Sequence, residues 1–121
     1  MTGKLLRRQV LANGLILEFH DRSQLMAGDR WQVILEVRVP IPVSAATLPP
    51  DLADRAAEVS AALGPEVVFT QQEVHYFIDV HEVPGLLQEM QTRLLRGLEG
   101  YLGHPDFAGR YLRKKFAERR F

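Results

Sequence analysis

The sequence predicts an α+β fold, a two-layer sandwich in which a mainly antiparallel meander sheet carries helices on one face. Three observations predict it: Asn13-Gly14 is a hairpin signal, residues 31–39 alternate between apolar and polar side chains, and from Val83 the apolar period becomes helical. The predicted order of elements is β-β-β-α-β-α-α. Because the first three strands follow one another without helices between them, this order contradicts a doubly wound parallel sheet.

Length and composition fit one domain. The chain has 121 residues, 46% of them hydrophobic and none of them cysteine, which excludes disulfides and cysteine-based zinc sites. A chain of this size buries about two-thirds of the surface that its unfolded form exposes, so it needs no such staple. We expect a single domain over residues 1–121, composed of a β-meander over 1–43, a helix over 50–64, a strand over 67–80 and two C-terminal helices over 83–120.

The hairpin signal sets the register of the first two strands. A two-residue type I′ turn needs positive φ at both of its positions, and Asn13-Gly14 supplies it at low cost. The register that follows pairs Val10 with Leu17 on the core face and Leu11 with Ile16 on the outer face.

After a polar turn over residues 21–29, the alternation over 31–39 predicts a long, half-buried strand. Its valines and leucine face the core, and Ile34 lies on the outer face. Pro40 and Pro42 lack the N–H that a central strand donates, so pairing ends there or continues only along an edge.

Apolar spacing of three and four residues predicts the helices. The helix over 50–64 is stopped by Gly64-Pro65, and the helix from Val83 ends in a run of glycines at every third position, namely Gly97, Gly100 and Gly103. Each such glycine costs about 1 kcal/mol inside a helix, so this end frays or packs very closely. The last helix covers 106–120.

The strand over 67–80 changes its pattern along its length. Val67 and Phe69 lie on one parity, whereas Val74, Tyr76 and Ile78 lie on the other. A bulge near residues 70–72 reconciles the two halves, and a second hairpin is the alternative.

The net charge of zero hides an uneven distribution. Basic and acidic residues number 15 each, but residues 65–100 carry a net charge of −4 and residues 101–121 a net charge of +4. The balance argues against a globally basic nucleic-acid binder, although it leaves room for a local basic patch. The longest uncharged stretch, over 39–50, has 12 residues and is too short to span a bilayer. The simplest interpretation is a cytoplasmic protein of bacterial type.

Glu73, His75, Asp79 and His81 share one parity, so an unbent strand would direct all four to one face. Carboxylate and imidazole groups in this arrangement are metal ligands or acid and base catalysts, with His75, Asp79 and His81 as the candidate ligands. The alternative is a solvated outer face, which alternation demands anyway.

The last helix carries a basic stripe. Arg110, Arg113, Lys114 and Arg120 fall within an arc of about 120° on a helical wheel. This stripe has three interpretations. It binds phosphate or nucleic acid with nearby aromatic rings stacking on bases, it complements the helix dipole, or it docks against the acidic segment over 65–100.

The outer face of the predicted meander carries Leu11, Ile16 and Ile34, which would form an interface for self-association if they were contiguous. We find no specific catalytic motif and expect no cofactor. The favoured hypothesis is a non-catalytic protein–protein interaction module, acting as a homodimer or on another protein. The alternatives are nucleic-acid or phosphate binding through the basic helix and a metal-dependent enzyme at the histidine-bearing strand face.

Overall fold

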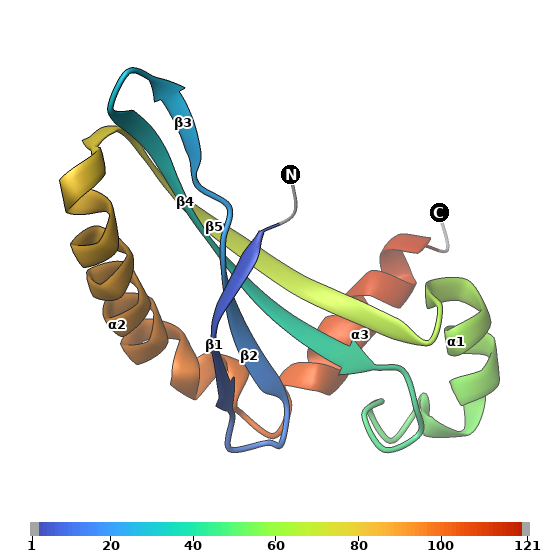
Figure 1. Cartoon of the computed structure of the whole chain (residues 1–121). Coiled ribbons are helices and arrows are strands. Elements are labelled where there is room, and N and C mark those ends of the chain that lie inside the picture. Colours follow the sequence, from blue (N-terminus) through green and yellow to red (C-terminus); the bar gives the residue numbers. More distant parts are fainter. Residues whose placement is uncertain (1–2, 120–121) are drawn as a thin grey trace.

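The computed structural model describes residues 3–119, shown in Figure 1. Within them an antiparallel, curled sheet of five strands is accompanied by three α-helices, which confirms the predicted α+β class. The strands are β1 (Lys4–Val10), β2 (Ile16–Asp21), β3 (Gln24–Ala27), β4 (Arg30–Pro42) and β5 (Glu66–Asp79). The helices are α1 (Ala56–Leu63), α2 (Val83–Leu102) and α3 (Phe107–Arg119), with short 3₁₀ turns η1 (Ala53–Arg55) and η2 (Val80–Glu82) before α1 and α2.

β4 is the centre of the sheet. Along one edge it pairs with β3 and then with β2, and along its other edge it pairs with β5. β1 extends the sheet beyond β2. The predicted polar turn over 21–29 is therefore wrong in part, because β3 occupies Gln24–Ala27 and the tight turn lies at Gly28-Asp29. Gly28 has a φ of 58°, which suits the first position of a type II′ hairpin turn.

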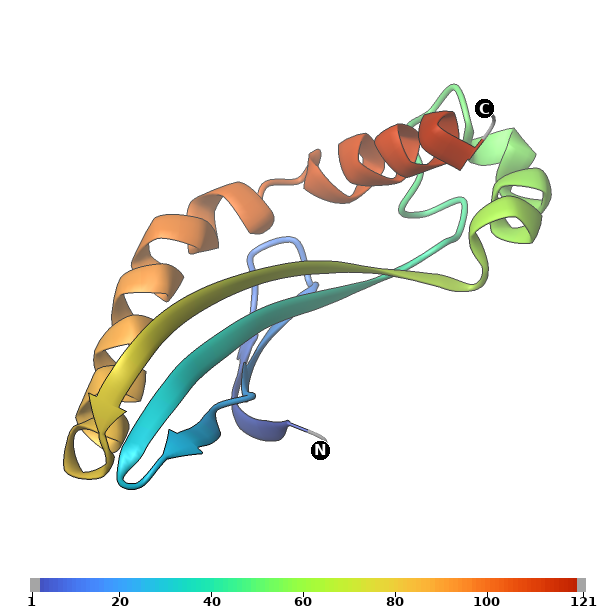
Figure 2. The ribbon, with the colours of Figure 1, turned by 90° about the horizontal axis from the view of Figure 1, so that it is seen from above.

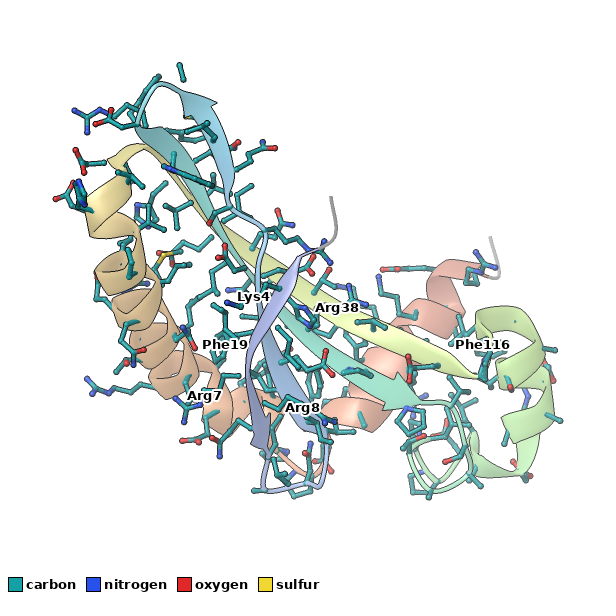
Figure 3. All side chains as sticks on the ribbon, in the orientation of Figure 1. Lys4, Arg7, Arg8, Phe19, Arg38 and Phe116 are labelled. Carbon is teal, nitrogen blue, oxygen red and sulfur yellow. The ribbon has the colours of Figure 1, made fainter. Side chains whose placement is uncertain are left out.

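The helices cover one face of the sheet. In Figure 2, α2 and α3 follow one another along one side of the β4–β5 ribbon, and α1 lies beside the end of α3. Phe19 from the sheet and Phe116 from α3 are buried between these layers (Figure 3). The predicted alternation of β4 is confirmed, since a row of its side chains is fully buried, namely Val33, Leu35, Val37, Val39 and Ile41.

The predicted register of the first hairpin is wrong by one residue. Val10 pairs with Ile16 instead of Leu17, and the turn is a three-residue loop in which the Gly14 amide donates to the Leu11 carbonyl at 2.9 Å. Gly14 has a φ of 87°, as expected of the bulge position that follows a type I turn. The shift reverses the faces of β1 relative to β2 and places Leu11 in the core at 3% exposure.

Asn13 explains why this loop replaces the two-residue turn. Its amide nitrogen donates to the carbonyls of Leu102 at 2.9 Å and His104 at 3.1 Å, and its side-chain oxygen accepts from the Leu15 amide. The side chain thus satisfies the Leu102 carbonyl, which the end of α2 leaves without an intrahelical partner, and also binds the His104 carbonyl in the following loop. The hairpin loop is fastened to the end of the helix.

The end of α2 packs closely instead of fraying. A Cβ atom added to Gly103 would lie 2.8 Å from the Glu99 carbonyl oxygen and 3.4 Å from Leu11 Cβ, whereas Gly97 and Gly100 have open space around them. Of these three glycines, only Gly103 is required by close packing, because a side chain there would clash. The helix predicted over 50–64 begins later than expected, because Leu52 and Ala53 form turns that lead into the 3₁₀ segment.

β5 is one bulged strand and not a hairpin. Residues 70–72 pair regularly with β4, so the predicted position of the bulge is wrong. The irregularity lies further along, between the pairs Val33 with His75 and Trp31 with Ile78, where Tyr76 and Phe77 together face a single residue of β4.

Within residues 3–119, no helix combines the length and apolar character that crossing a membrane requires.

Truncating two adjacent side chains of β1 and its loop tests the observed register. We expect Leu11→Ala to lower the free energy of unfolding by about 2–5 kcal/mol, because it opens a cavity in the core. Val10→Ala should change it by no more than about 0.5 kcal/mol, because Val10 is 67% exposed. Urea denaturation followed by circular dichroism measures both. The two-residue turn predicts the reverse order, so a larger loss from Val10→Ala would contradict the structure.

Candidate functional site: the apolar end of the sheet

Exposed apolar side chains gather where β3 and β5 flank the beginning of β4. Of the eight large hydrophobic side chains that are exposed within residues 3–119, five lie here, each at least 38% exposed. They are Leu25, Met26, Tyr76, Phe77 and Val80, and we call this surface the apolar end. Figure 1 shows it as the end of the ribbon farthest from α1.

Backbone pairing holds the apolar end together. Leu25 pairs with Trp31 of β4, and Trp31 pairs with Ile78 of β5. The Val80 amide donates to the Asp29 carbonyl at 3.0 Å, which ties the η2 turn to the β3–β4 turn. β4 lies between β3 and β5, so the backbones of these two strands are about 10 Å apart, and the apolar end is one end of the ribbon and not a single face of it.

Phe77 is the most unusual residue of this surface. It is 71% exposed, and its φ of 58° is the one positive value of a non-glycine residue within residues 3–119. That conformation costs an L-residue about 1–2 kcal/mol. Its exposed ring gains little hydrophobic stabilisation in return, and retained strain of this kind is found mainly at functional positions.

A shallow apolar hollow of about 390 Å³ adjoins Val80, which is the one of these five side chains that lines it. Trp31, Val80, Val83 and Pro84 supply its apolar wall, and Lys4, Asp21 and Ser23 complete its rim. The same end of the molecule therefore presents both protruding aromatic side chains and a depression of matching chemistry.

The charges of the apolar end are partly paired. The Arg30 guanidinium lies 3.0 Å from the Asp79 carboxylate and 3.8 Å from that of Asp29. The hydrogen bond from the His81 amide, supported by Arg30, lowers the pKa of Asp79. This carboxylate is thus ionised and paired, and the three side chains together carry one formal negative charge.

The candidate metal ligands His75, Asp79 and His81 do not converge. The bulge at Phe77 changes the parity of β5, so His75 lies on the helix-covered side while Asp79 pairs with Arg30 and His81 lies in η2. In the part of the chain that the structure describes, no group of three or more His, Asp or Glu side chains could hold a metal ion. The prediction that all four polar residues share one face is therefore wrong.

Glu73 and His75 instead form a structural pair with a helix. Glu73 accepts a hydrogen bond from Arg93 of α2 at 2.9 Å, and its other oxygen lies 2.8 Å from His75 Nε2. The Arg93 contact is the main reason why the pKa of Glu73 falls to about 2. These groups fasten α2 to β5 across the edge of the core.

The three predicted interface residues do not form one patch. Leu11 is buried in the core because of the shifted hairpin register, so its prediction as an outer-face residue is wrong. Ile16 and Ile34 are half-buried on the open face of the sheet. They lie on different strands, about six positions or 20 Å apart along the ribbon, and their role as interface residues stays a prediction.

The open face between them is polar. Glu36 is 7% exposed there, because longer side chains cover it. Burial opposes its ionisation, but hydrogen bonds from Arg22 Nε at 2.7 Å and from Gln72, with the charge of Arg38, outweigh burial and lower its pKa. This network satisfies its own charges and leaves little for a ligand.

The structure divides the basic residues of the last helix. Arg113 makes a bidentate contact with Asp51, outside the acidic segment over 65–100, whereas Arg110 and Lys114 line a pocket with aromatic side chains. Arg120 lies outside the described residues.

Sequence reasoning missed the apolar end, because the alternation of Val74, Tyr76 and Ile78 gives no sign of the bulge. The run of exposed Leu25 and Met26 beside a glycine turn was the available signal.

The chain was compared with protein-family models, with curated proteins and with solved structures, and it matches none of them.

The Glu73–Arg93 contact gives the stability of the protein a defined pH dependence. The pKa of Glu73 lies near 2 in the folded protein and near 4.5 without the contact, so the stabilisation is complete above about pH 4.5 and is lost as the pH falls toward 2. We expect Glu73→Gln to flatten the loss of stability in that window, measured by urea denaturation at several pH values. Glu99→Gln is the matched control, because Glu99 is an exposed residue of α2, the helix that carries Arg93. This variant should keep the wild-type dependence of stability on pH. If the free energy of unfolding falls equally steeply with pH in wild type and in Glu73→Gln, the Glu73–Arg93 contact does not contribute to stability.

Proposed function

We propose that this protein is a non-catalytic interaction module that forms a homodimer through its apolar end. The observation that carries the proposal is Phe77, an aromatic side chain held in solvent by a strained backbone. A fold that needed only its own core would gain from burying or replacing this residue. Contact with a second protein surface supplies the burial that the monomer lacks.

The choice of a second copy as partner rests on self-complementarity. A two-fold interface uses the same surface on both subunits, so a projection and a depression must occur together. The apolar end has both, in Phe77 and in the hollow beside Trp31. Pairing with Arg30 reduces the charge of Asp29 and Asp79 to one net negative charge, which lowers the repulsion between two identical surfaces.

The two edges of the sheet support the same choice. β1 carries Lys4, Arg7 and Arg8, and charged side chains on an edge strand discourage pairing with another chain (Figure 3). The end of β5 carries the exposed aromatic side chains Tyr76 and Phe77 in the corresponding position. We therefore place the contact at β5. A cytoplasmic location is part of the proposal and agrees with the lack of cysteine.

Sedimentation equilibrium tests this function. We expect the wild-type protein to have twice its chain mass of 13.7 kDa at micromolar concentrations. Phe77→Ser should raise the dimer dissociation constant at least about tenfold, which corresponds to about 1.4 kcal/mol, without changing the circular dichroism spectrum. Val10→Ser removes an equally exposed aliphatic side chain far from the apolar end and should leave the constant unchanged.

A wild-type protein that stays monomeric throughout the concentration series would refute the proposal. A dimer that Phe77→Ser and Val10→Ser weaken equally would refute the assigned surface. Ile16→Asp and Ile34→Asp examine the open face in the same way.

A further inference from the structure

A second surface, at the junction of α2 and α3, has the chemistry of a small-ligand site. It is a pocket of about 330 Å³, near the lower limit of ligand-binding cavities. Residues from the first half of β5, the end of α2, the following loop and α3 line it. Phe69 on its floor lies eight residues before Phe77, about 25 Å along β5, so this pocket is separate from the apolar end.

Four aromatic rings build the wall of the pocket. Phe107 and Tyr111 stack with their ring centroids 5.7 Å apart, and Phe69 meets both of them edge-on at 5.7 and 5.6 Å. Tyr101 meets Phe107 at 5.3 Å but remains 62% exposed. Three of these rings hold one another in place, and Tyr101 offers the free aromatic surface.

Cationic and hydrogen-bonding groups surround this wall. Arg110 and Lys114 are one turn apart on α3, so their side chains lie on one face of the helix. Lys114 makes no hydrogen bond or ion pair within residues 3–119. Arg110 contacts Asp106 at 3.4 Å, longer than the 2.7–2.9 Å of a strong charge-assisted hydrogen bond. Both cations are therefore available to an anion.

His104 completes the rim. Its Nδ1 accepts a hydrogen bond from the Asp106 amide at 3.0 Å, which leaves Nε2 as the nitrogen that donates. The carbonyls of Leu102 and His104, which would repel an anion, are bound by Asn13. No carboxylate lines the pocket among the described residues.

The other described cations of α3 each have a partner within the protein. Arg113 is paired with Asp51, Lys115 lies 3.5 Å from Glu118 and over the ring of Tyr111, and Arg119 donates to the Ala62 carbonyl. Among the described cations of α3, Lys114 is thus the one without a partner, and Arg110 has only the long contact with Asp106. An open aromatic surface beside these two cations and an N–H donor matches a planar ring that carries a phosphate.

We propose that this pocket binds one nucleotide unit, with its base on Tyr101 and its phosphate between Arg110 and Lys114. Base stacking on an aromatic side chain and phosphate contact by cations are the two terms that single-stranded nucleic-acid sites combine. The unit comes either from a free mononucleotide or from a single strand, and the experiment separates these sources.

Fluorescence anisotropy at low salt, with a labelled adenosine monophosphate and a labelled single-stranded decanucleotide, tests the site. We expect Tyr101→Ala and Lys114→Glu each to bind these probes about tenfold or more weakly than the wild-type protein does. Tyr101→Ala loses the stacked base, and Lys114→Glu loses a phosphate contact. Tyr101→Phe keeps the ring and should bind as wild type does. Arg96→Glu makes the same charge change as Lys114→Glu on an exposed part of α2 outside the pocket and should have little effect.

Competition with unlabelled compounds identifies the ligand. Adenosine monophosphate should compete at least about tenfold better than adenosine or inorganic phosphate, because each of these lacks one of the two contacts. Tighter binding of the decanucleotide than of the mononucleotide assigns the site to a strand, and equal binding assigns it to the free nucleotide. Absence of binding by both probes, or equal weakening by Lys114→Glu and Arg96→Glu, would overturn the proposal. Circular dichroism confirms that each variant is folded.

Discussion

The register between β4 and β5 is the constraint on which the rest of the structure depends. The two strands pair from Arg30 with Asp79 to Pro42 with Glu66, and this register fixes which side chains of β4 form the fully buried row. The helices that cover this row are positioned by it. A shift of one residue would exchange the core face and the open face along the whole ribbon. The single irregularity, at Tyr76 and Phe77, is therefore the point where the ribbon changes its surface chemistry.

The two proposed surfaces follow from how charge and apolar area are distributed along this ribbon. Before the bulge, Glu73 is used to hold Arg93 of α2, and beyond it Asp79 neutralises Arg30. These charges are used by contacts that fasten elements together. The two proposed surfaces are instead an apolar surface at one end of the ribbon, and Arg110 and Lys114 beside aromatic rings at the junction of α2 and α3.

The sequence predicted those features that local pattern alone determines. The alternation over residues 31–39 has one interpretation, and the buried valines of β4 confirm it. The hairpin register was not predictable, because Asn13-Gly14 is compatible with two turns. The choice between them depends on Leu102 and His104, which are 89 and 91 residues away in the sequence. The change of parity along residues 67–78 indicated a bulge but not its position at Phe77, since phenylalanine is common in strands. Arg110 and Lys114 were identified by spacing, but their aromatic neighbour Phe69 was brought to them by the fold.

The central claim is that β5 holds Phe77 in a strained conformation that serves contact and not folding. The most direct test compares the free energies of unfolding of Phe77→Gly and Phe77→Ala, measured by urea denaturation in dilute solution, where the chain is monomeric. In an ordinary strand, glycine is less stable than alanine by about 0.5–1 kcal/mol. At a positive φ of 58° the order reverses, and the account predicts that Phe77→Gly is more stable than Phe77→Ala by about 1 kcal/mol. A Phe77→Gly variant that is less stable than Phe77→Ala would contradict it.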